Sequence, residues 1–139
     1  MYKTTLLMPS LAADNWHLLK GFVKKALDHG VNETPIEEWL RRILGFQAQL
    51  WVFEKDDVIK GVGITQFLEY NTHKTLHLVA VAGEDWVEWK DQLTVVEEFA
   101  KKHGCKALEQ WGRKGWEKIL PKHFPGFETV YHVMRKEII

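Results

Sequence analysis

Hydrophobic residues recur along the chain with two different periods, and the period changes twice. In Leu11–His29 they recur every three or four positions, as on one face of a helix. The residues of this face are Leu19, Phe22, Val23, Ala26 and Leu27. Residues 34–45 repeat the pattern with Ile36, Leu40, Ile43 and Leu44. Gly30 and Gly45 follow the two stretches and are expected to end the helices.

The start of the second helix carries a local sequence signature. Thr34 precedes Pro35, and Glu37 stands three residues after Thr34. Proline suits the first turn of a helix, and Thr-x-x-Glu is the pattern of a capping box, in which the two side chains satisfy free backbone N–H groups. The sequence therefore predicts a capped helix that runs to Leu44.

The middle of the chain has the pattern of β-strands. Gln47–Glu54 and Val58–Phe67 flank Asp56 and Asp57, which predicts a β-hairpin with a tight turn. Thr75–Ala82 is nearly continuous in apolar residues, as expected for a strand that is covered on both faces. Tyr2–Met8 is a further short strand at the N-terminus.

The helical period returns after Gly83 and alternates with strands to the end of the chain. One long helix is predicted with a buried face of Trp86, Trp89, Leu93, Val96 and Ala100, ending at Gly104. The remaining elements are a strand at Cys105–Trp111, a helix at Arg113–Leu120 ended by Pro121, and a last strand at Phe127–Lys136. The order β-α-α-β-β-β-α-β-α-β predicts a single α/β domain over residues 1–139, with a mixed sheet of the α+β kind and one parallel crossover.

Composition narrows the function classes. The 139 residues are 45% hydrophobic and 27% charged, which is typical of a globular domain. The 19 basic residues balance the 19 acidic ones, so the charge excess of a nucleic-acid-binding protein is missing. We find no secretory signal and no apolar run long enough to span a membrane, and we expect a cytoplasmic protein or a virion component made in the cytoplasm. One cysteine and scattered histidines predict neither a disulfide nor a metal site.

Four segments, taken in order, resemble the GNAT superfamily of N-acetyltransferases. The hairpin with Gly61 and Gly63 in its second arm is similar to the second and third strands of that family. Leu76–Val81 with the following helix resembles the fourth strand and the cofactor-binding helix. Ala100-x-x-x-Gly104 is similar to the entry into the fifth strand, and Gly126-Phe127 followed by Met134-x-Lys136 resembles the end of many GNAT chains. The match covers nearly the whole chain.

The resemblance implies acetyl-CoA as the cofactor and an amine as the acceptor. In the family, the pantetheine arm pairs with the backbone of the fourth strand, here at Val79 and Val81. The pyrophosphate rests on N–H groups at the start of the next helix, where a helix terminus attracts anions. The positions that the resemblance assigns to this second contact are Gly83 and Trp86, with Arg113 and Lys114 as further anion contacts.

The chain departs from the family pattern in two places. The cofactor loop of the family reads [Arg/Gln]-x-x-Gly-x-[Gly/Ala], whereas Gly83–Glu88 holds one glycine and three carboxylates, which we expect to oppose the binding of acetyl-CoA. The family also places a tyrosine before the Gly-Phe pair as a proton donor, and residues 120–125 hold none. His123 is a candidate donor, and Glu69 and Glu109 are candidate general bases.

Two functions remain open on this basis. The first is a non-catalytic binding or assembly module that resembles degenerate GNAT-like proteins of phages and prophages and binds an unknown protein partner. The second is a divergent N-acetyltransferase that uses acetyl-CoA and acts on an unknown small amine. Edge strands and seven tryptophans permit a homo-oligomer in either case.

Overall fold

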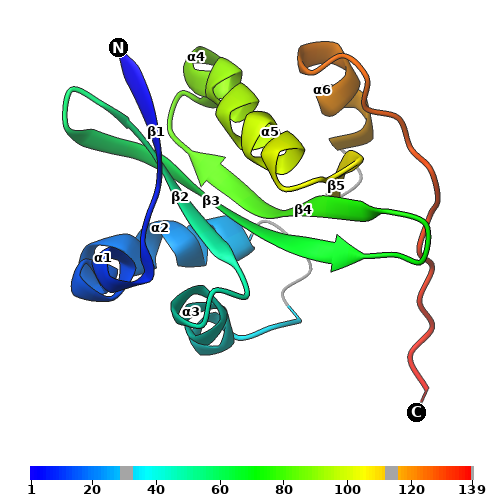
Figure 1. Cartoon of the computed structure of the whole chain (residues 1–139), viewed down its shortest axis with the longest axis horizontal. Helices are drawn as coiled ribbons and strands as arrows, with labels where there is room; N and C mark the ends of the chain where they lie inside the picture. Colours follow the sequence, from blue (N-terminus) through cyan, green and yellow to red (C-terminus); the bar gives the residue numbers. More distant parts are fainter. Residues whose placement is uncertain (29–32, 112–115, 139) are drawn as a thin grey trace.

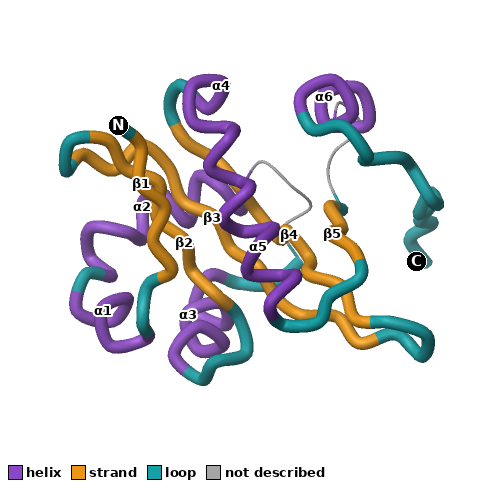
Figure 2. The backbone as a smooth tube through the Cα atoms, turned by 45° about the horizontal axis from the view of Figure 1, so that its top comes forward, coloured by secondary structure: helices purple, strands orange, loops and turns teal. Residues whose placement is uncertain are grey.

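The computed structural model describes residues 1–28, 33–111 and 116–138, and these form a three-layer arrangement around one sheet (Figure 1). The sheet has five strands in the order β1-β2-β3-β4-β5. Three helices, α1 to α3, cover one face of the sheet, and α4 to α6 lie over the other. Figure 2 shows the same layers. Helix α5 follows β4 in the chain, packs over the sheet and leads into β5.

The strands follow the predicted order closely. They span Tyr2–Leu6 (β1), Gln49–Lys55 (β2), Val58–Glu69 (β3), Lys74–Gly83 (β4) and Ala107–Gln110 (β5). Neighbouring strands are antiparallel except for β4 and β5, which are parallel. The hairpin turn at Asp56 and Asp57 has φ angles of 52° and 66°, and this left-handed pair matches the twist of a two-residue hairpin.

The predicted helix Leu11–His29 is wrong in one respect, because the structure has two helices there. These are α1 (Pro9–Asp14) and α2 (Trp16–Asp28), separated at Asn15. The side-chain amide of Asn15 donates to the carbonyl of Leu11 at 2.9 Å, and asparagine commonly competes with the backbone of a helix in this way. The predicted C-cap Gly30 lies outside the described residues.

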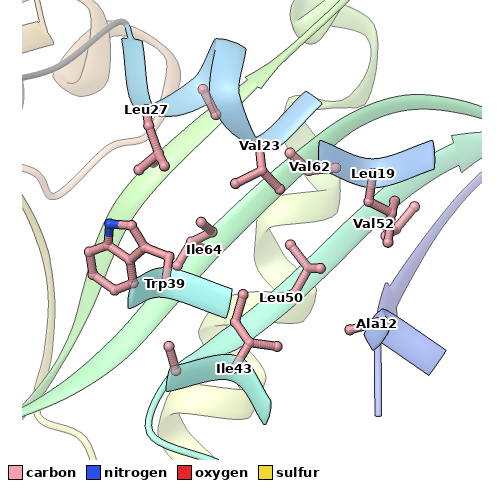
Figure 3. Close-up of a cluster of buried hydrophobic side chains, with 13 residues drawn as sticks. Ala12, Leu19, Val23, Leu27, Trp39, Ile43, Leu50, Val52, Val62 and Ile64 are labelled. Carbon is pink, nitrogen blue, oxygen red and sulfur yellow. The ribbon is translucent and has the colours of Figure 1, made fainter. Parts of the chain in front are cut away.

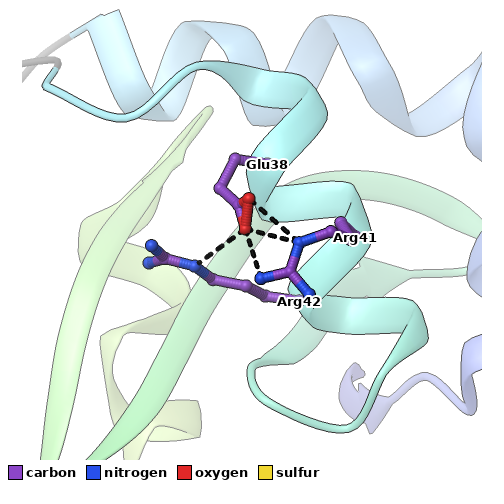
Figure 4. A network of polar contacts seen from close by, with 3 residues as sticks. All are labelled: Glu38, Arg41 and Arg42. Atoms are coloured by element: carbon purple, nitrogen blue, oxygen red, sulfur yellow. Dashed lines mark hydrogen bonds and ion pairs between the residues drawn. The ribbon is translucent and has the colours of Figure 1, made fainter.

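The second predicted helix forms as α3 (Ile36–Leu44), but without the capping box. Pro35 occupies the N-cap position, and no side chain caps the helix. The buried stripe is also shifted, since Trp39 and Ile43 are buried whereas Leu44 is exposed. Bulk explains the shift: the indole of Trp39 fills the space beneath the helix. Glu38 pairs with Arg41 and Arg42 on the polar side of α3 (Figure 4).

Each face of the sheet carries its own hydrophobic cluster. The first lies beneath α1, α2 and α3 and joins Leu19, Val23 and Ile43 to the strand residues Leu50 and Ile64 (Figure 3). The second cluster lies beneath the other helices. Its buried members are Trp51, Phe53, Leu76, Leu78, Trp89, Val96 and Ala100. The central strands are thus covered on both faces, as the apolar run in β4 predicts.

The long helix predicted after Gly83 is divided into three pieces. They are α4 (Trp86–Trp89), a 3₁₀ turn η1 (Lys90–Gln92) and α5 (Leu93–Lys102). The division follows Trp89, whose side chain turns into the second cluster and stacks on Phe53 with a centroid separation of 4.6 Å. Gly104 ends α5 with a φ of +78°, the left-handed conformation expected of a C-cap glycine.

The C-terminal part differs from its prediction at two points. Helix α6 spans Trp116–His123 and contains Pro121, so this proline does not end it. Pro121 stands near the C-terminal end of α6, where it removes only one backbone hydrogen bond. The last strand predicted at Phe127–Lys136 does not form, and residues 127–138 have no regular secondary structure. High strand propensity needs a neighbouring strand to pair with, and this segment pairs with none of the described strands.

None of the helices in the described residues is both long and apolar enough to cross a lipid bilayer.

Candidate functional site

The free edge of β4 is the first feature of the candidate site. Strand β5 pairs with β4 only from Thr75 to Leu78, whereas β4 continues to Gly83 alongside β3. The register shifts at the same place, because Ala80 and Leu78 face consecutive residues of β3 and Val79 is left as a bulge. Within the described residues, the stretch from Val79 to Gly83 therefore keeps one edge unpaired. Val79 and Val81, which the GNAT resemblance assigns to the cofactor, both lie on this stretch and are partly exposed.

Gly83 is the last residue of β4, at a point where no side chain fits. A Cβ added there would lie 2.3 Å from the carbonyl oxygen of Lys60 and 2.5 Å from the Cα of Gly61. The next residue continues this close approach, since the backbone N–H of Glu84 donates to the Lys60 carbonyl at 2.8 Å. The loop after β4 is therefore attached to the start of β3 by its own backbone.

One hydrogen bond from Trp89 and one within the loop fix the residues after Gly83. The indole N–H of Trp89 donates to the carbonyl of Glu84 at 2.7 Å, and the Trp89 side chain is 1% exposed. Asp85 has a φ of 52°, in the left-handed region, and its carbonyl accepts the N–H of Glu88 at 2.9 Å. Two backbone N–H groups of the loop, those of Glu84 and Glu88, are thus already bonded and are not free to bind an anion.

Three carboxylates surround the same loop. The side chains of Glu84, Asp85 and Glu88 are all exposed. Glu88 accepts a hydrogen bond of 2.7 Å from the hydroxyl of Tyr2 in β1, and this bond raises the pKa of Tyr2 to about 12. Because α4 is only four residues long, its N-terminal partial charge is small compared with that of a full helix. The loop is an acidic surface.

A shallow hollow adjoins the loop on the side of α2. Its volume is about 230 Å³. The side chains and backbone that line it are Leu18, Gly21, Phe22, Lys25, Ala82, Gly83 and Glu84. The lining is mostly apolar, with Lys25 and Glu84 as its two charged groups, so the hollow is better suited to an apolar side chain than to a pyrophosphate.

A polar cluster occupies the paired part of β4 and β5. The parallel register places His77 beside Glu109. The carboxylate of Glu109 accepts hydrogen bonds from the Tyr70 hydroxyl at 2.9 Å, the Trp111 indole N–H at 2.9 Å and the Tyr131 hydroxyl at 3.1 Å. Three chain segments that are far apart in sequence therefore meet at one carboxylate.

His77 is the buried member of this cluster. Its ring packs on Trp111 with a centroid separation of 4.3 Å, and its Nδ1 lies 3.3 Å from the side-chain amide of Gln66. Burial lowers the pKa of His77 to about 4, although the charge of Glu109 acts in the opposite direction. The imidazole is therefore neutral near pH 7 and a weak proton acceptor.

The electrostatic state of Glu109 suits a structural role. Burial alone would raise the pKa of its carboxyl, but the bonds from Trp111, Tyr70 and Tyr131 together hold that pKa below its usual value. Hydrogen bonds to the charged form stabilise it. A carboxylate that accepts three hydrogen bonds and has a lowered pKa is a weak base towards a substrate. The role of the cluster is therefore to link the strand ends through hydrogen bonds.

Of the other candidate residues, the structure describes Glu69 and His123. Glu69 ends β3 opposite Lys74, at the far end of the sheet from Gly83. His123 ends α6, and its Nδ1 lies 3.2 Å from the Nζ of Lys90 in η1. Arg113 and Lys114 lie outside the described residues, and so does the side chain of Trp86. No group of three or more potential metal ligands occurs in the parts of the chain that the structure describes.

The sequence did not single out the cluster around Glu109, although Glu109 itself was a candidate. Tyr70, His77 and Trp111 stand in a turn, a strand and a strand end, and only the parallel register brings them together. The alternation of polar His77 and Glu109 with apolar neighbours in two strands was the one available signal.

Comparison with known proteins shows likeness in structure but not in sequence. No protein-family model matches the chain, and no curated protein sequence matches it. An aminoglycoside acetyltransferase from an uncultured soil metagenomic sample, solved with sisomicin, superimposes with a TM-score of 0.71 at 15% identity, over 99% of this chain and 97% of that one.

Two further structures give the same result. A GNAT family acetyltransferase of Staphylococcus aureus has a TM-score of 0.70 at 17% identity, over 99% of this chain and 98% of that one. The aminoglycoside N-acetyltransferase AAC(6')-Iy, solved with CoA, has a TM-score of 0.71 at 12% identity, over 99% and 95% of the two chains. At identities this low, the likeness shows the fold alone.

Proposed function

The chain has the fold of the GNAT acetyltransferases, as the sequence predicts, and on that premise we propose that it is a non-catalytic binding module. Its partner is a protein, and acetyl-CoA is not its ligand. The observation that carries this proposal is the loop after β4, which carries three exposed carboxylates and whose Glu84 is bonded to Lys60 and Trp89.

Charge repulsion supports the proposal. The pyrophosphate of acetyl-CoA is an anion, and in this fold it would approach Glu84, Asp85 and Glu88. Two like charges about 4 Å apart in water repel by about 1 kcal/mol. Three such pairs would weaken binding by roughly 100-fold. The loop also lacks the N–H of Glu84 as a free donor, because that group is bonded to Lys60.

The proton-transfer candidates support the same proposal. The carboxylate of Glu109 accepts three hydrogen bonds, and Nδ1 of His77 is beside the amide of Gln66. Nδ1 of His123 faces the Nζ of Lys90, and a lysine donates to a nitrogen only if that nitrogen carries no proton. Glu109, His77 and His123 are thus each engaged in a structural contact that acid–base chemistry at that atom would break. The remaining candidate, Glu69, stands at the far end of the sheet from Gly83.

One observation favours the second candidate function, a divergent N-acetyltransferase that acts on a small amine. The bulge at Val79 and the free edge that follows it leave backbone groups of β4 open to pair with an extended ligand. A pantetheine arm could use these groups even if the pyrophosphate were poorly held.

The resemblance to phage proteins gives the first proposal its more specific form, in which the protein partner belongs to a virion. Mass spectrometry of purified particles from a host that encodes this chain tests that form. The protein is expected in the particles, and its absence from them would leave the binding module without its virion role.

Thermal denaturation with acetyl-CoA tests the main proposal. A ligand that binds only the folded state raises the melting temperature by mass action. We expect no saturable rise for the natural chain up to millimolar acetyl-CoA. A variant with Glu84→Gln, Asp85→Asn and Glu88→Gln removes the three charges and is expected to gain a measurable rise. Glu97→Gln with Glu98→Gln, on exposed positions of α5, is the matched control. A saturable rise for the natural chain would support the acetyltransferase instead.

A further inference from the structure

Gly21 stands in the interior of helix α2, where the packing of the described residues does not require a glycine. Glycine weakens the interior of a helix relative to alanine. A Cβ added at Gly21 would meet no described atom within 4 Å, so the glycine is not there to make room for a neighbour in the same chain. What the missing side chain leaves open is the hollow between α2 and the end of β4, which Gly21 lines.

This hollow has the size and the lining to receive one aromatic ring. Its volume is about 230 Å³. An engineered apolar cavity of about 150 Å³ is already large enough to bind benzene. Leu18 and Phe22 supply apolar walls, and Leu18 is 59% exposed. A side chain larger than hydrogen at Gly21 would project into the space that the ring needs.

Phe46, which follows α3, is unfavourable at its own position in two ways. It is 73% exposed, and its φ of 61° lies in the left-handed region. The N–H of Gln47 donates to the carbonyl of Arg42 at 2.7 Å. The N–H of Phe46 donates to the carbonyl of Ile43 at 3.3 Å, and the two bonds together form the Schellman ending of a helix. Glycine usually holds the left-handed position of this motif. An exposed aromatic side chain in a strained conformation points to a contact with another molecule.

The charges beside the two features are opposite in sign. Arg41 and Arg42 lie in the last turn of α3, just before Phe46. They share the single carboxylate of Glu38, so this end of the helix keeps a positive charge (Figure 4). The hollow borders the acidic loop after β4, which carries three exposed carboxylates, against one lysine, Lys25, in the lining. The aromatic side chain and the hollow are therefore complementary in charge as well as in shape.

The ring of Phe46 does not reach the hollow of its own chain. Gly83, in the lining of the hollow, lies level with Gly61 of β3, which in turn pairs with Phe53 of β2. Strand β2 begins at Gln49, four residues before Phe53, and Phe46 precedes it. Four strand residues span about 13 Å. A ring that fills the hollow must therefore come from another molecule.

We propose that copies of this chain associate head to tail, with Phe46 of one copy inserted into the hollow between α2 and β4 of the next. The two arginines at the end of α3 then approach the acidic loop of that next copy. The contact accounts for both residues, because the ring needs the space that a side chain at Gly21 would fill, and the next copy covers the ring that is exposed here. Since the two surfaces differ, the contact repeats and gives either a closed ring or a row of copies.

Sedimentation velocity of the full chain, from micromolar to millimolar concentration, tests the association. We expect a weight-average mass that rises with concentration above the 16.3 kDa of one chain. Phe46→Gly removes the aromatic ring and Gly21→Leu fills the hollow, so each variant alone is expected to stay a monomer. Val58→Ala, at an exposed apolar position of the β2–β3 hairpin, is the matched control and should associate as the natural chain does.

A mixture of the two variants tests the head-to-tail arrangement itself. The Phe46→Gly copy keeps the hollow and the Gly21→Leu copy keeps the ring, so one of each can bind, but no third copy can add. We expect the equimolar mixture to form a complex of twice the chain mass and nothing larger, although each variant alone is a monomer. A symmetric dimer, in which like surfaces meet, does not give this result.

Urea denaturation, at a concentration at which the natural chain is a monomer, separates association from folding. Both variants should unfold at a higher urea concentration than the natural chain, because glycine suits the left-handed position of Phe46 and leucine suits a helix interior. A lower midpoint for both variants would mean that folding accounts for the two residues, and would overturn the inference.

Three sedimentation results would also overturn it: a natural chain that is a monomer at every concentration, association that persists in either variant, or a mixture of the variants that stays monomeric. The inference rests on the proposed function only in that the partner is a protein. Its failure would leave that function standing, because the response to acetyl-CoA tests the function separately.

Discussion

The buried imidazole of His77 should make the stability of the protein depend on pH, and His77→Gln should remove that dependence. In the folded chain the ring is 6% exposed, and burial lowers its pKa to about 4. In the unfolded chain the ring is solvated, with an ordinary pKa of about 6.5. Between these two values the unfolded state binds a proton that the folded state does not.

The sign and size of the effect follow from this difference. Because the unfolded chain binds more protons, stability rises with pH in this window and is lost as the pH falls from about 6.5 towards about 4. Each unit of pKa difference corresponds to about 1.4 kcal/mol, so the full effect is about 3 kcal/mol. This is a large part of the roughly 5–15 kcal/mol by which domains are stable.

Urea denaturation between about pH 7 and about pH 4.5 measures the effect. The natural chain should lose on the order of 2–3 kcal/mol of unfolding free energy over this range, in addition to losses from other groups. Those other losses are common to both proteins, so the difference between the natural chain and His77→Gln isolates the imidazole. Parallel pH profiles for the two proteins would refute the reasoning, since they would mean that His77 titrates normally in the folded state.

Two further substitutions test the closed loop after β4. Gly83→Ala forces a Cβ against Lys60 and should lower the unfolding free energy, measured by urea denaturation, by about 1–3 kcal/mol, as overpacking does. Gly21 has open space around it, so Gly21→Ala is the control and should be neutral or stabilising. Equal effects of the two substitutions would mean that the contact at Gly83 is not tight. Trp89→Phe keeps an aromatic ring on Phe53 but leaves the Glu84 carbonyl without its donor. It should lower the unfolding free energy by about 1–3 kcal/mol in the same measurement. A change near zero would show that this hydrogen bond does not stabilise the loop.

The sequence predicted the sheet better than it predicted the ends of the helices. The five strands from Tyr2 to Gln110 were found because alternation, turn residues and the apolar run of β4 are local signals. The capping box at Thr34 and Glu37 failed although its pattern was present, because Pro35 became the N-cap. The break at Asn15 depends on one side-chain hydrogen bond, which no periodicity reveals.

The candidate site was predictable only in part, for a physical reason. The acidic character of Gly83–Glu88 is visible in the sequence. The hydrogen bonds that Glu84 donates to Lys60 and accepts from Trp89 depend instead on the position of the end of β4 beside the start of β3. The cluster at Glu109 depends on the parallel register with His77. The last strand was predicted from residue type and from the GNAT resemblance. Strand formation also requires hydrogen bonds to a neighbouring strand, which propensity does not supply.

A titration of acetyl-CoA into isotopically labelled protein, followed by amide NMR shifts, tests most directly whether this fold has lost its cofactor site. If the acidic loop after β4 opposes the cofactor, amides from Val79 to Glu88 should show no saturable shift at millimolar acetyl-CoA. Saturable shifts confined to the free edge of β4 and this loop would contradict the account, because they would show that the natural chain binds acetyl-CoA where the acetyltransferases of this fold do.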